Sequence, residues 1–227
     1  MRNLFNVAAM TTLLLCVFAG AIQSAEPSKK ENRWEKAIRQ FEAADAKSPP
    51  ATGGILFIGS SSIRGWKLDD YFADLPVINR GFGGSQIADS THFAERIVFP
   101  YKPKTIVLYA GDNDMAAGKT PKQVAADYGA FVAKLQATLP KVKIVFIAIK
   151  PSIKRWALVE KMREANRLIR TITKKDKRQA FVDVDKPMIG ADGRPRKELF
   201  QKDGLHLNAK GYKLWASLVR PQLPAGN

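Results

Sequence analysis

Four separated segments of the chain carry small polar residues that could do chemistry. They are Gly59-Ser60-Ser61-Ser62, Gly81-Phe82-Gly83-Gly84-Ser85, Gly111-Asp112-Asn113-Asp114 and Asp203-Gly204-Leu205-His206. Taken singly, each has ordinary turn composition, because Gly, Ser, Asn and Asp are the common turn residues. Together they supply a hydroxyl, an amide, a carboxylate and an imidazole. Proteins use these groups to transfer an acyl group through a serine.

The last segment places an acid and a base on one local turn. A serine hydroxyl is a poor nucleophile until an imidazole accepts its proton, and a carboxylate holds that imidazole in the required tautomer. His206 and Asp203 lie three residues apart, so little tertiary precision is needed to bring them together. They are the predicted base and acid. This chemistry alone does not choose a nucleophile among the neighbouring serines 60 to 62.

The order of the segments resembles that of the SGNH hydrolases, also called GDSL esterases and lipases. This family carries a Ser, a Gly, an Asn and a His in four separated blocks. Residues 57–66 are similar to the first block, 79–84 to the second, 111–114 to the third and 203–206 to the fifth. The resemblance implies a flavodoxin-like fold and the activity of a serine esterase.

The resemblance also implies a role for each matching residue. Ser61, His206 and Asp203 would form the catalytic triad. The backbone N–H groups of Ser61 and Gly84 and the side-chain amide of Asn113 would form the oxyanion hole. A glycine at position 84 lets the backbone approach the oxyanion without a side chain in the way. No cofactor and no metal are implied.

The first block departs from the family pattern at one position. The acidic residue that usually precedes the nucleophile is Ser60 here, which gives Gly-Ser-Ser-Ser in place of Gly-Asp-Ser. Ser60 and Ser62 are therefore rival hydroxyls. Ser61 is the predicted nucleophile because of its place in the alignment.

Several other residues near these blocks have two interpretations. Three aromatic residues could line the acyl or alcohol pocket or pack in the core: Trp66, Phe82 and Trp156. Arg64 and Arg80 could attract an anionic substrate or anchor loops. His92 is predicted to be structural, because nothing near it in the sequence forms a proton relay.

The elements that must position these segments follow from the hydrophobic pattern. From Ile55 onward short apolar runs alternate with longer amphipathic ones, which is typical of βα units around a parallel sheet. Strands are expected at residues 55–58, 77–78, 105–109, 143–149 and 180–183, and helices at 85–96, 121–138, 155–174 and 208–218. The predicted fold is a three-layer α/β/α sandwich with a five-stranded parallel sheet. The four segments should meet at the carboxyl ends of its strands.

Helix boundaries are marked at three places. Thr120-Pro121 combines a cap residue with a first-turn proline, and Asn208 can cap the final helix. Trp34, Ile38 and Phe41 have helical spacing, which predicts an amphipathic helix within residues 31–46.

The first 25 residues are predicted to be a secretory signal. Arg2 precedes an apolar run from Val7 to Ile22, and small residues follow. A retained membrane anchor is the alternative, although the run is shorter than the roughly 20 residues that span a bilayer. The expected domains are a signal peptide at 1–25, a helix and linker at 26–52 and the hydrolase domain at 53–227. The mature protein would be periplasmic or extracellular and, since Cys16 is the only cysteine, it would lack disulfides.

The net charge of the chain indicates the class of partner, but it does not identify a particular one. The net charge of +16 falls only to +15 without residues 1–25, because Arg2 is the only charged residue there. Such a surplus favours anionic partners and non-specific polyanion binding. The basic residues are scattered along helical stretches, so no specific nucleic-acid site is predicted.

The sequence therefore predicts a serine esterase for small O-acyl esters, with acetyl groups on carbohydrate as the expected substrate. Loops at the expected active edge are short, and no long apolar insertion suggests a deep acyl channel. A lysophospholipase or thioesterase of the same family is one alternative. A non-catalytic glycan-binding module is another.

Overall fold

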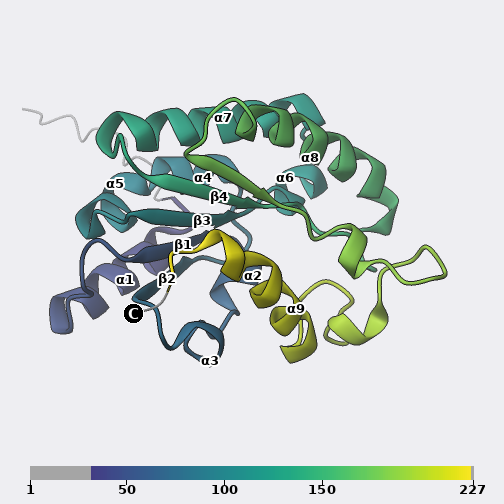
Figure 1. The fold of residues 1–227 in the computed structure, drawn as a ribbon, viewed down its shortest axis with the longest axis horizontal. Coiled ribbons are helices and arrows are strands. Elements are labelled where there is room, and N and C mark those ends of the chain that lie inside the picture. Colours follow the sequence, from purple (N-terminus) through teal and green to yellow (C-terminus); the bar gives the residue numbers. More distant parts are fainter. Residues whose placement is uncertain (1–31, 226–227) are drawn as a thin grey trace, which may run out of the picture. The chain divides into compact units, whose positions relative to one another are not determined.

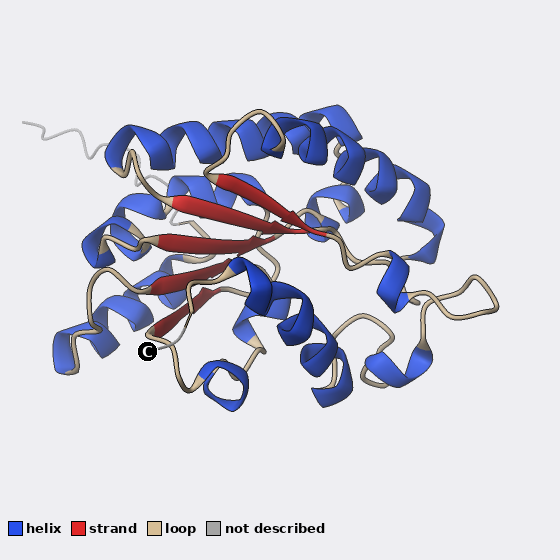
Figure 2. Cartoon of the chain, viewed as in Figure 1, coloured by secondary structure: helices blue, strands red, loops and turns tan. Residues whose placement is uncertain are grey.

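Five parallel strands form one sheet in the computed structural model, which describes residues 32–225 (Figures 1 and 2). The strands are β1 (Ile55–Gly59), β2 (Val77–Gly81), β3 (Thr105–Tyr109), β4 (Lys143–Ile147) and β5 (Gln179–Val182). Their order across the sheet is β2-β1-β3-β4-β5, and all neighbouring pairs are parallel. This flavodoxin-like order confirms the predicted fold class. The predicted signal segment, residues 1–25, lies outside the described residues.

Helices cover both faces of the sheet. One face packs against α1 (Glu35–Lys47), α4 (Ile87–His92), α5 (Ala94–Ile97), α7 (Pro121–Thr138) and α8 (Val159–Thr173). The other packs against α2 (Ser61–Arg64), α3 (Asp69–Phe72) and α9 (Ala209–Val219). Figure 1 shows α7 and α8 above the sheet, with α3 and α9 below it.

The strands supply both hydrophobic cores, because successive side chains of a strand point to opposite faces. In β1, Leu56 and Ile58 belong to the cluster under α7 and α8. Ile55 and Phe57 belong to the cluster under α9. All four are buried, which explains why the strands read as continuous apolar runs in the sequence.

Two helices begin where the sequence predicts. The Thr120 hydroxyl accepts a hydrogen bond from the Gln123 N–H at 3.3 Å, and α7 spans the predicted 121–138. The Asn208 side chain accepts from the N–H groups of Lys210 and Gly211, at 2.9 and 3.2 Å. Both caps satisfy N–H groups that a helix start leaves without partners.

Other boundaries differ from prediction. The helix expected at 85–96 is broken at Phe93 into α4 and α5, and the buried Phe93 ring packs in the core. A 3-10 turn at Trp156–Leu158 precedes α8, which begins at Val159 and not at 155. Strand β4 ends two residues before the predicted 149, and Trp34 precedes α1 instead of lying within it.

The end of β1 depends on a glycine. Gly59 has φ +134°, and a Cβ atom there would lie 1.9 Å from the carbonyl oxygen of Tyr109 on β3. The two strands therefore approach more closely than a side chain would allow. Immediately after this point the chain turns into the short helix α2, with Ser61 as its first residue.

Candidate active site

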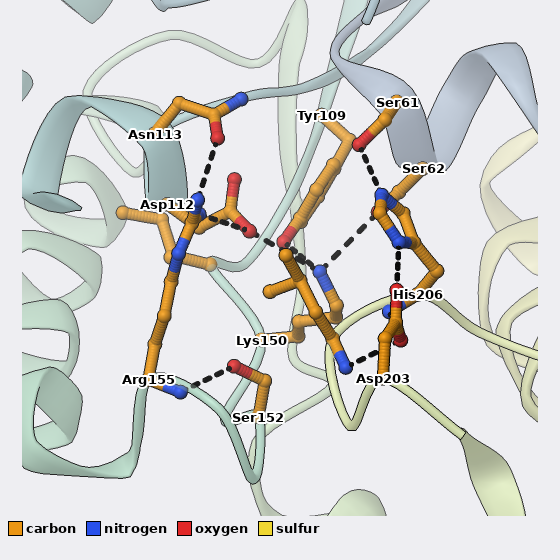
Figure 3. A network of polar contacts seen from close by, with 12 residues as sticks. Ser61, Ser62, Tyr109, Asp112, Asn113, Lys150, Ser152, Arg155, Asp203 and His206 are labelled. Carbon is orange, nitrogen blue, oxygen red and sulfur yellow. Dashed lines mark hydrogen bonds and ion pairs between the residues drawn. The ribbon is translucent and has the colours of Figure 1, made fainter. Parts of the chain in front are cut away.

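Ser61, His206 and Asp203 form a continuous chain of hydrogen bonds at the carboxyl edge of the sheet (Figure 3). Ser61 Oγ lies 3.0 Å from His206 Nε2, and His206 Nδ1 lies 2.5 Å from Asp203 Oδ2. Ser61 comes from the turn after β1, whereas the other two come from the loop before α9. The structure thus brings together three residues from opposite ends of the domain.

The loop that carries Asp203 and His206 is fixed by its own backbone. Asp203 Oδ1 accepts hydrogen bonds from the N–H groups of Leu205 and His206, at 2.9 and 3.0 Å. Gly204 between them has φ +64°, a conformation that L side chains rarely adopt. Its carbonyl accepts from the N–H of Lys154, at 3.0 Å, so the loop is also tied to the chain beyond β4.

Asp203 is held in its charged form. Burial acts to raise the pKa of Asp203, but hydrogen bonds from the His206 ring and from the N–H groups of Leu205 and His206 outweigh it. They lower the pKa well below the usual range of an aspartate. An ionised carboxylate at this position keeps the proton of the imidazole on Nδ1 and leaves Nε2 as the acceptor that faces Ser61.

Neither rival hydroxyl forms a hydrogen bond with the His206 ring, whose nitrogens contact Ser61 and Asp203. Ser60 is buried, and its Oγ has no hydrogen-bond partner among the described residues. Ser62 is also buried, and its Oγ accepts from Lys150 Nζ at 3.2 Å. Ser61 is the partly exposed member of the three serines.

Of the predicted oxyanion residues outside α2, Gly84 lies on the turn after β2, and Asn113 lies in the short helix α6 (Asp112–Ala116) that follows β3. Asn113 Nδ2 donates to the carbonyl oxygen of Ser85 at 3.0 Å, and its Oδ1 accepts from Arg155 Nη2 at 3.0 Å. Because an amide nitrogen carries two hydrogens, Nδ2 retains a second donor. Gly84 is exposed with φ +79°, and a Cβ built there would meet nothing within 4 Å. Space above its backbone is therefore open.

A buried cluster of charges lies beside these residues (Figure 3). Lys150 Nζ lies 3.3 Å from Asp112 Oδ2 and 3.0 Å from the Tyr109 hydroxyl. On the other side of the carboxylate, Arg155 Nη1 lies 3.0 Å from the same Oδ2. Both Lys150 and Asp112 are almost wholly buried. Arg155 therefore links this cluster to Asn113.

The cluster determines the charge state of Asp112. Burial acts to raise its pKa, but the positive charges of Lys150 and Arg155 outweigh burial and lower the pKa below its usual value. Burial lowers the pKa of Lys150, and the Asp112 charge opposes this effect. Sequence reasoning missed both Lys150 and Arg155. The available signal was a lysine directly after a buried apolar run, at the edge where the other site residues meet.

The remaining candidates divide between the core and the surface. Trp66 and Phe82 are buried in the two cores and do not line the site. Trp156 is partly exposed, with the guanidinium groups of Arg163 and Arg194 against its ring. Arg80 is buried and anchored, since its Nη2 donates to Asp45 at 2.6 Å.

Two candidates are exposed. The Arg64 side chain has no ion-pair or hydrogen-bond partner within residues 32–225. His92 lies at the end of α4, with its ring centroid 4.6 Å from that of Phe93. It has no contact with Ser61, Asp203 or Asn113 in the described part of the chain.

Comparison with known proteins identifies the family. Residues 57–214 match the family model described as GDSL-like Lipase/Acylhydrolase. The chain belongs to this family. The resemblance to SGNH hydrolases is confirmed, and the GDSL-family chain is a carboxylic ester hydrolase.

Relatives of this GDSL protein are similar over most of its length. Platelet-activating factor acetylhydrolase IB subunit alpha1 of Homo sapiens is 26% identical over 194 residues, or 80% of this chain and 79% of the relative. A structure from Streptococcus pneumonia has a TM-score of 0.75 at 21% identity, over 83% of this chain and 92% of that one. A GDSL-like lipase from Bacteroides thetaiotaomicron has a TM-score of 0.70 at 20% identity, over 82% and 96%. At these identities the two solved structures show the shared fold.

Between residues 32 and 225, no helix combines the length and apolar character needed to cross a membrane. The same residues contain no group of three or more His, Cys, Asp or Glu side chains suited to hold a metal ion.

Proposed function

We propose that the chain is a serine esterase that hydrolyses small O-acyl esters, with acetyl esters of carbohydrates as the substrate class. One observation carries this proposal. The hydrogen-bonded chain from Ser61 Oγ through His206 to Asp203 has the geometry required for proton transfer during acyl transfer, with heavy-atom distances of 3.0 and 2.5 Å.

In the proposed reaction, Ser61 Oγ attacks the acyl carbon while its proton moves to His206 Nε2. Asp203 stabilises the imidazolium that forms and remains ionised. Collapse of the tetrahedral intermediate breaks the bond to the alcohol, which leaves with the proton from Nε2. Water then repeats the sequence on the acyl-enzyme. It gives its proton to His206 and releases a carboxylic acid and free Ser61.

The negative charge that develops on the carbonyl oxygen needs donors that are already in place. We assign this role to the N–H groups of Ser61 and Gly84 and to the second hydrogen of Asn113 Nδ2. Arg155 orients the amide, because a guanidinium can only donate hydrogen bonds and so requires Oδ1 to face it. Arg155 is thus a positioning residue, held in turn by Asp112.

Two observations favour a small acyl group. Ser61 lies on the short turn between β1 and α2 at the carboxyl edge of the sheet, and the Homo sapiens relative is named as an acetylhydrolase. A panel of p-nitrophenyl esters from acetyl to palmitoyl, run beside acetylated polysaccharides, tests this preference. A maximum at long chains would instead indicate a lysophospholipase or thioesterase.

Export is part of the same proposal, since residues 1–25 have the composition of a secretory signal. N-terminal sequencing of the mature protein from its natural host checks it. A mature chain that still begins at Met1 would contradict cleavage.

The nucleophile is tested by replacing neighbouring serines. Ser61→Ala should stay folded, lose ester turnover and take up no serine-directed phosphonate. Ser60→Ala is the matched control, because the Ser60 hydroxyl has no hydrogen-bond partner among residues 32–225 to lose. Labelling that persists in an active Ser61→Ala protein would overturn the assignment. Absence of turnover and labelling in the unmodified protein would favour a glycan-binding module.

A further inference from the structure

A cationic groove borders the proposed oxyanion loop. It has a volume of about 500 Å³ and is lined by Arg33, Trp34, Lys36, Ala37, Gln40, Arg64, Gly83 and Gly84. This volume is within the range of small-molecule sites, roughly 300–1,000 Å³. The lining contains three basic side chains and no acidic one.

The three cations of the groove are not paired with acidic side chains in the part of the chain that the structure describes. Arg33, Lys36 and Arg64 have no ion pair with any acidic group of residues 32–225. Nearby arginines behave differently, since Arg80 pairs with Asp45 and Arg96 pairs with acids of α1. Three like charges around one hollow repel one another and create a positive potential that an anion would relieve.

Three contacts hold the groove in a defined shape. The Arg33 guanidinium lies 3.4 Å from the centroid of the Trp34 ring, and its Nη2 donates to the carbonyl of Gly84 at 3.2 Å. Trp34 Nε1 donates to the carbonyl of Gly83 at 2.9 Å. Stacking and these bonds restrict Arg33 before any ligand arrives, which lowers the entropic cost of binding.

The position of Arg64 connects the groove to the reacting serine. Arg64 ends the helix α2 that begins at Ser61. A Cβ atom on Gly83 would lie 2.8 Å from Arg64 Cζ, so the guanidinium rests directly against the backbone of the oxyanion loop. A group bound in the groove would consequently lie beside an ester whose carbonyl oxygen points at Gly84.

We propose that this groove binds a carboxylate or phosphate group carried by the ester substrate, so that the preferred substrates are small anionic esters. The inference rests on the proposed esterase function and adds a substrate class to it. Arg64 and Lys36 would contact the anion through charge-assisted hydrogen bonds. Arg33 would contribute its charge while it remains bonded to Gly84.

The test compares acetylated sugars that differ in the group at C6. O-acetyl glucose is the neutral ester, O-acetyl glucuronate supplies a carboxylate, and O-acetyl glucose 6-phosphate supplies a phosphate. In the unmodified protein, kcat/KM should be at least tenfold higher for one anionic ester than for the neutral one. The two anionic arms distinguish a carboxylate site from a phosphate site.

Variants of the groove residues then test whether the preference for anionic esters depends on the groove. Arg64→Gln and Lys36→Gln should each lower the anionic-to-neutral ratio of kcat/KM about tenfold, as expected for loss of one hydrogen bond to a charged group. Both side chains are exposed, so folding should be unaffected. Lys141→Gln is the matched control: it also removes an exposed cation, but from the loop before β4, at the amino edge of the sheet. An equal fall in the control, or a ratio near one in the unmodified protein, would overturn the proposal.

Binding without turnover separates this proposal from the esterase function. Glucuronate or glucose 6-phosphate should bind the Ser61→Ala protein in titration calorimetry, and binding should weaken about tenfold when Arg64→Gln is added. If the unmodified protein cleaves no ester yet this Arg64-dependent binding remains, the esterase function fails and the anion site stands. If esters are cleaved but neither anion binds, the anion site fails.

Discussion

In the proposed mechanism, Asn113 and the charges behind it stabilise the transition state of acyl transfer. The amide oxygen is occupied by Arg155, and one amide hydrogen is occupied by the carbonyl of Ser85. The remaining hydrogen is therefore available in a fixed direction without reorganisation. Fixed donors of this kind act on charge that a ground-state ester lacks.

Replacement of Asn113 by Ala should lower kcat by about 10²–10³ with little change in KM, because the lost interaction forms mainly in the transition state. The melting temperature should change little. Steady-state kinetics beside a thermal melt checks both. A variant that melts early but turns over normally when cold would show that Asn113 only shapes the turn.

Arg155→Gln should lower kcat by about tenfold, less than Asn113→Ala does, since the amide remains but loses its orientation. Because Arg155 acts through Asn113, the double variant should be no slower than Asn113→Ala alone. Kinetics of the two single variants and the double variant measure this coupling. Strictly multiplicative losses would mean that Arg155 acts on the substrate directly.

The site residues that the sequence predicted and those it missed differ in the signal that each leaves in the sequence. Ser61, Asp203 and His206 belong to short segments whose order along the chain resembles the blocks of the family. Lys150 and Arg155 matter only because β4 ends beside β3, which places Lys150 against Asp112. The position of Lys150 after an apolar run marks it as a residue at the strand edge, but it does not identify Asp112 as its partner. That contact can be inferred only when the order of the strands is known.

At the scale of elements, the hydrophobic pattern of the sequence predicted the helices and strands that depend on periodicity. It did not predict the boundaries that depend on tertiary packing. Helix α7 begins and ends at its predicted residues, because its cap and first-turn proline are local signals. The helix break at Phe93 could not be predicted, because the burial of that ring in the core depends on tertiary contacts. The five strands lie near their predicted positions, because buried parallel strands need continuous apolar runs that can be recognised in the sequence.

Gly59→Ala should destabilise the domain by more than about 3 kcal/mol. Its Cβ would lie 1.9 Å from a backbone oxygen of β3, and φ +134° is itself unfavourable for alanine. Gly129→Ala in α7 is the matched control: its Cβ would meet nothing within 4 Å, so helix propensity should stabilise it by about 0.5–1 kcal/mol. Urea unfolding measures both. Equal stability of the two variants would contradict this account of the β1 end.

The start of α6 (Asp112–Ala116) should make stability depend on pH in the acid range, because its first residue is the buried Asp112. The folded pKa of Asp112 lies below its usual value, which is about 3.9 in unfolded chains. Its contribution is therefore fully present above the unfolded pKa and is lost as pH falls through the folded pKa.

Removal of one partner from such a buried cluster typically costs about 3–5 kcal/mol. Asp112→Asn should consequently be less stable by that amount between pH 6 and 8, and the difference should shrink only below about pH 4. Urea unfolding of both proteins from pH 7 to pH 3 gives the comparison. A difference that already closes near pH 6 would mean that burial raises the pKa of Asp112.

At the scale of the whole molecule, the net charge acts over longer distances than any single contact. A net charge of +16 on 227 residues creates a field that attracts anions from a distance, whereas the groove acts over hydrogen-bond distances. The two effects differ in their response to salt. The Debye length is about 8 Å at physiological ionic strength and about 3 Å at 1 M, so salt weakens the field far more than a close contact.

Raising salt from 0.05 to 0.5 M should therefore lower kcat/KM for an anionic acetyl ester several-fold by slowing encounter, while kcat at saturation stays nearly constant. The neutral ester should barely respond, because its approach gains nothing from the field. The comparison of Arg64→Gln with the unmodified protein across the same salt series separates field from contact. The variant should show a lower anionic-to-neutral ratio at every salt concentration, with a similar salt slope. If both esters lost activity equally with salt, the charge would be acting on the protein itself and not on its encounter with the substrate.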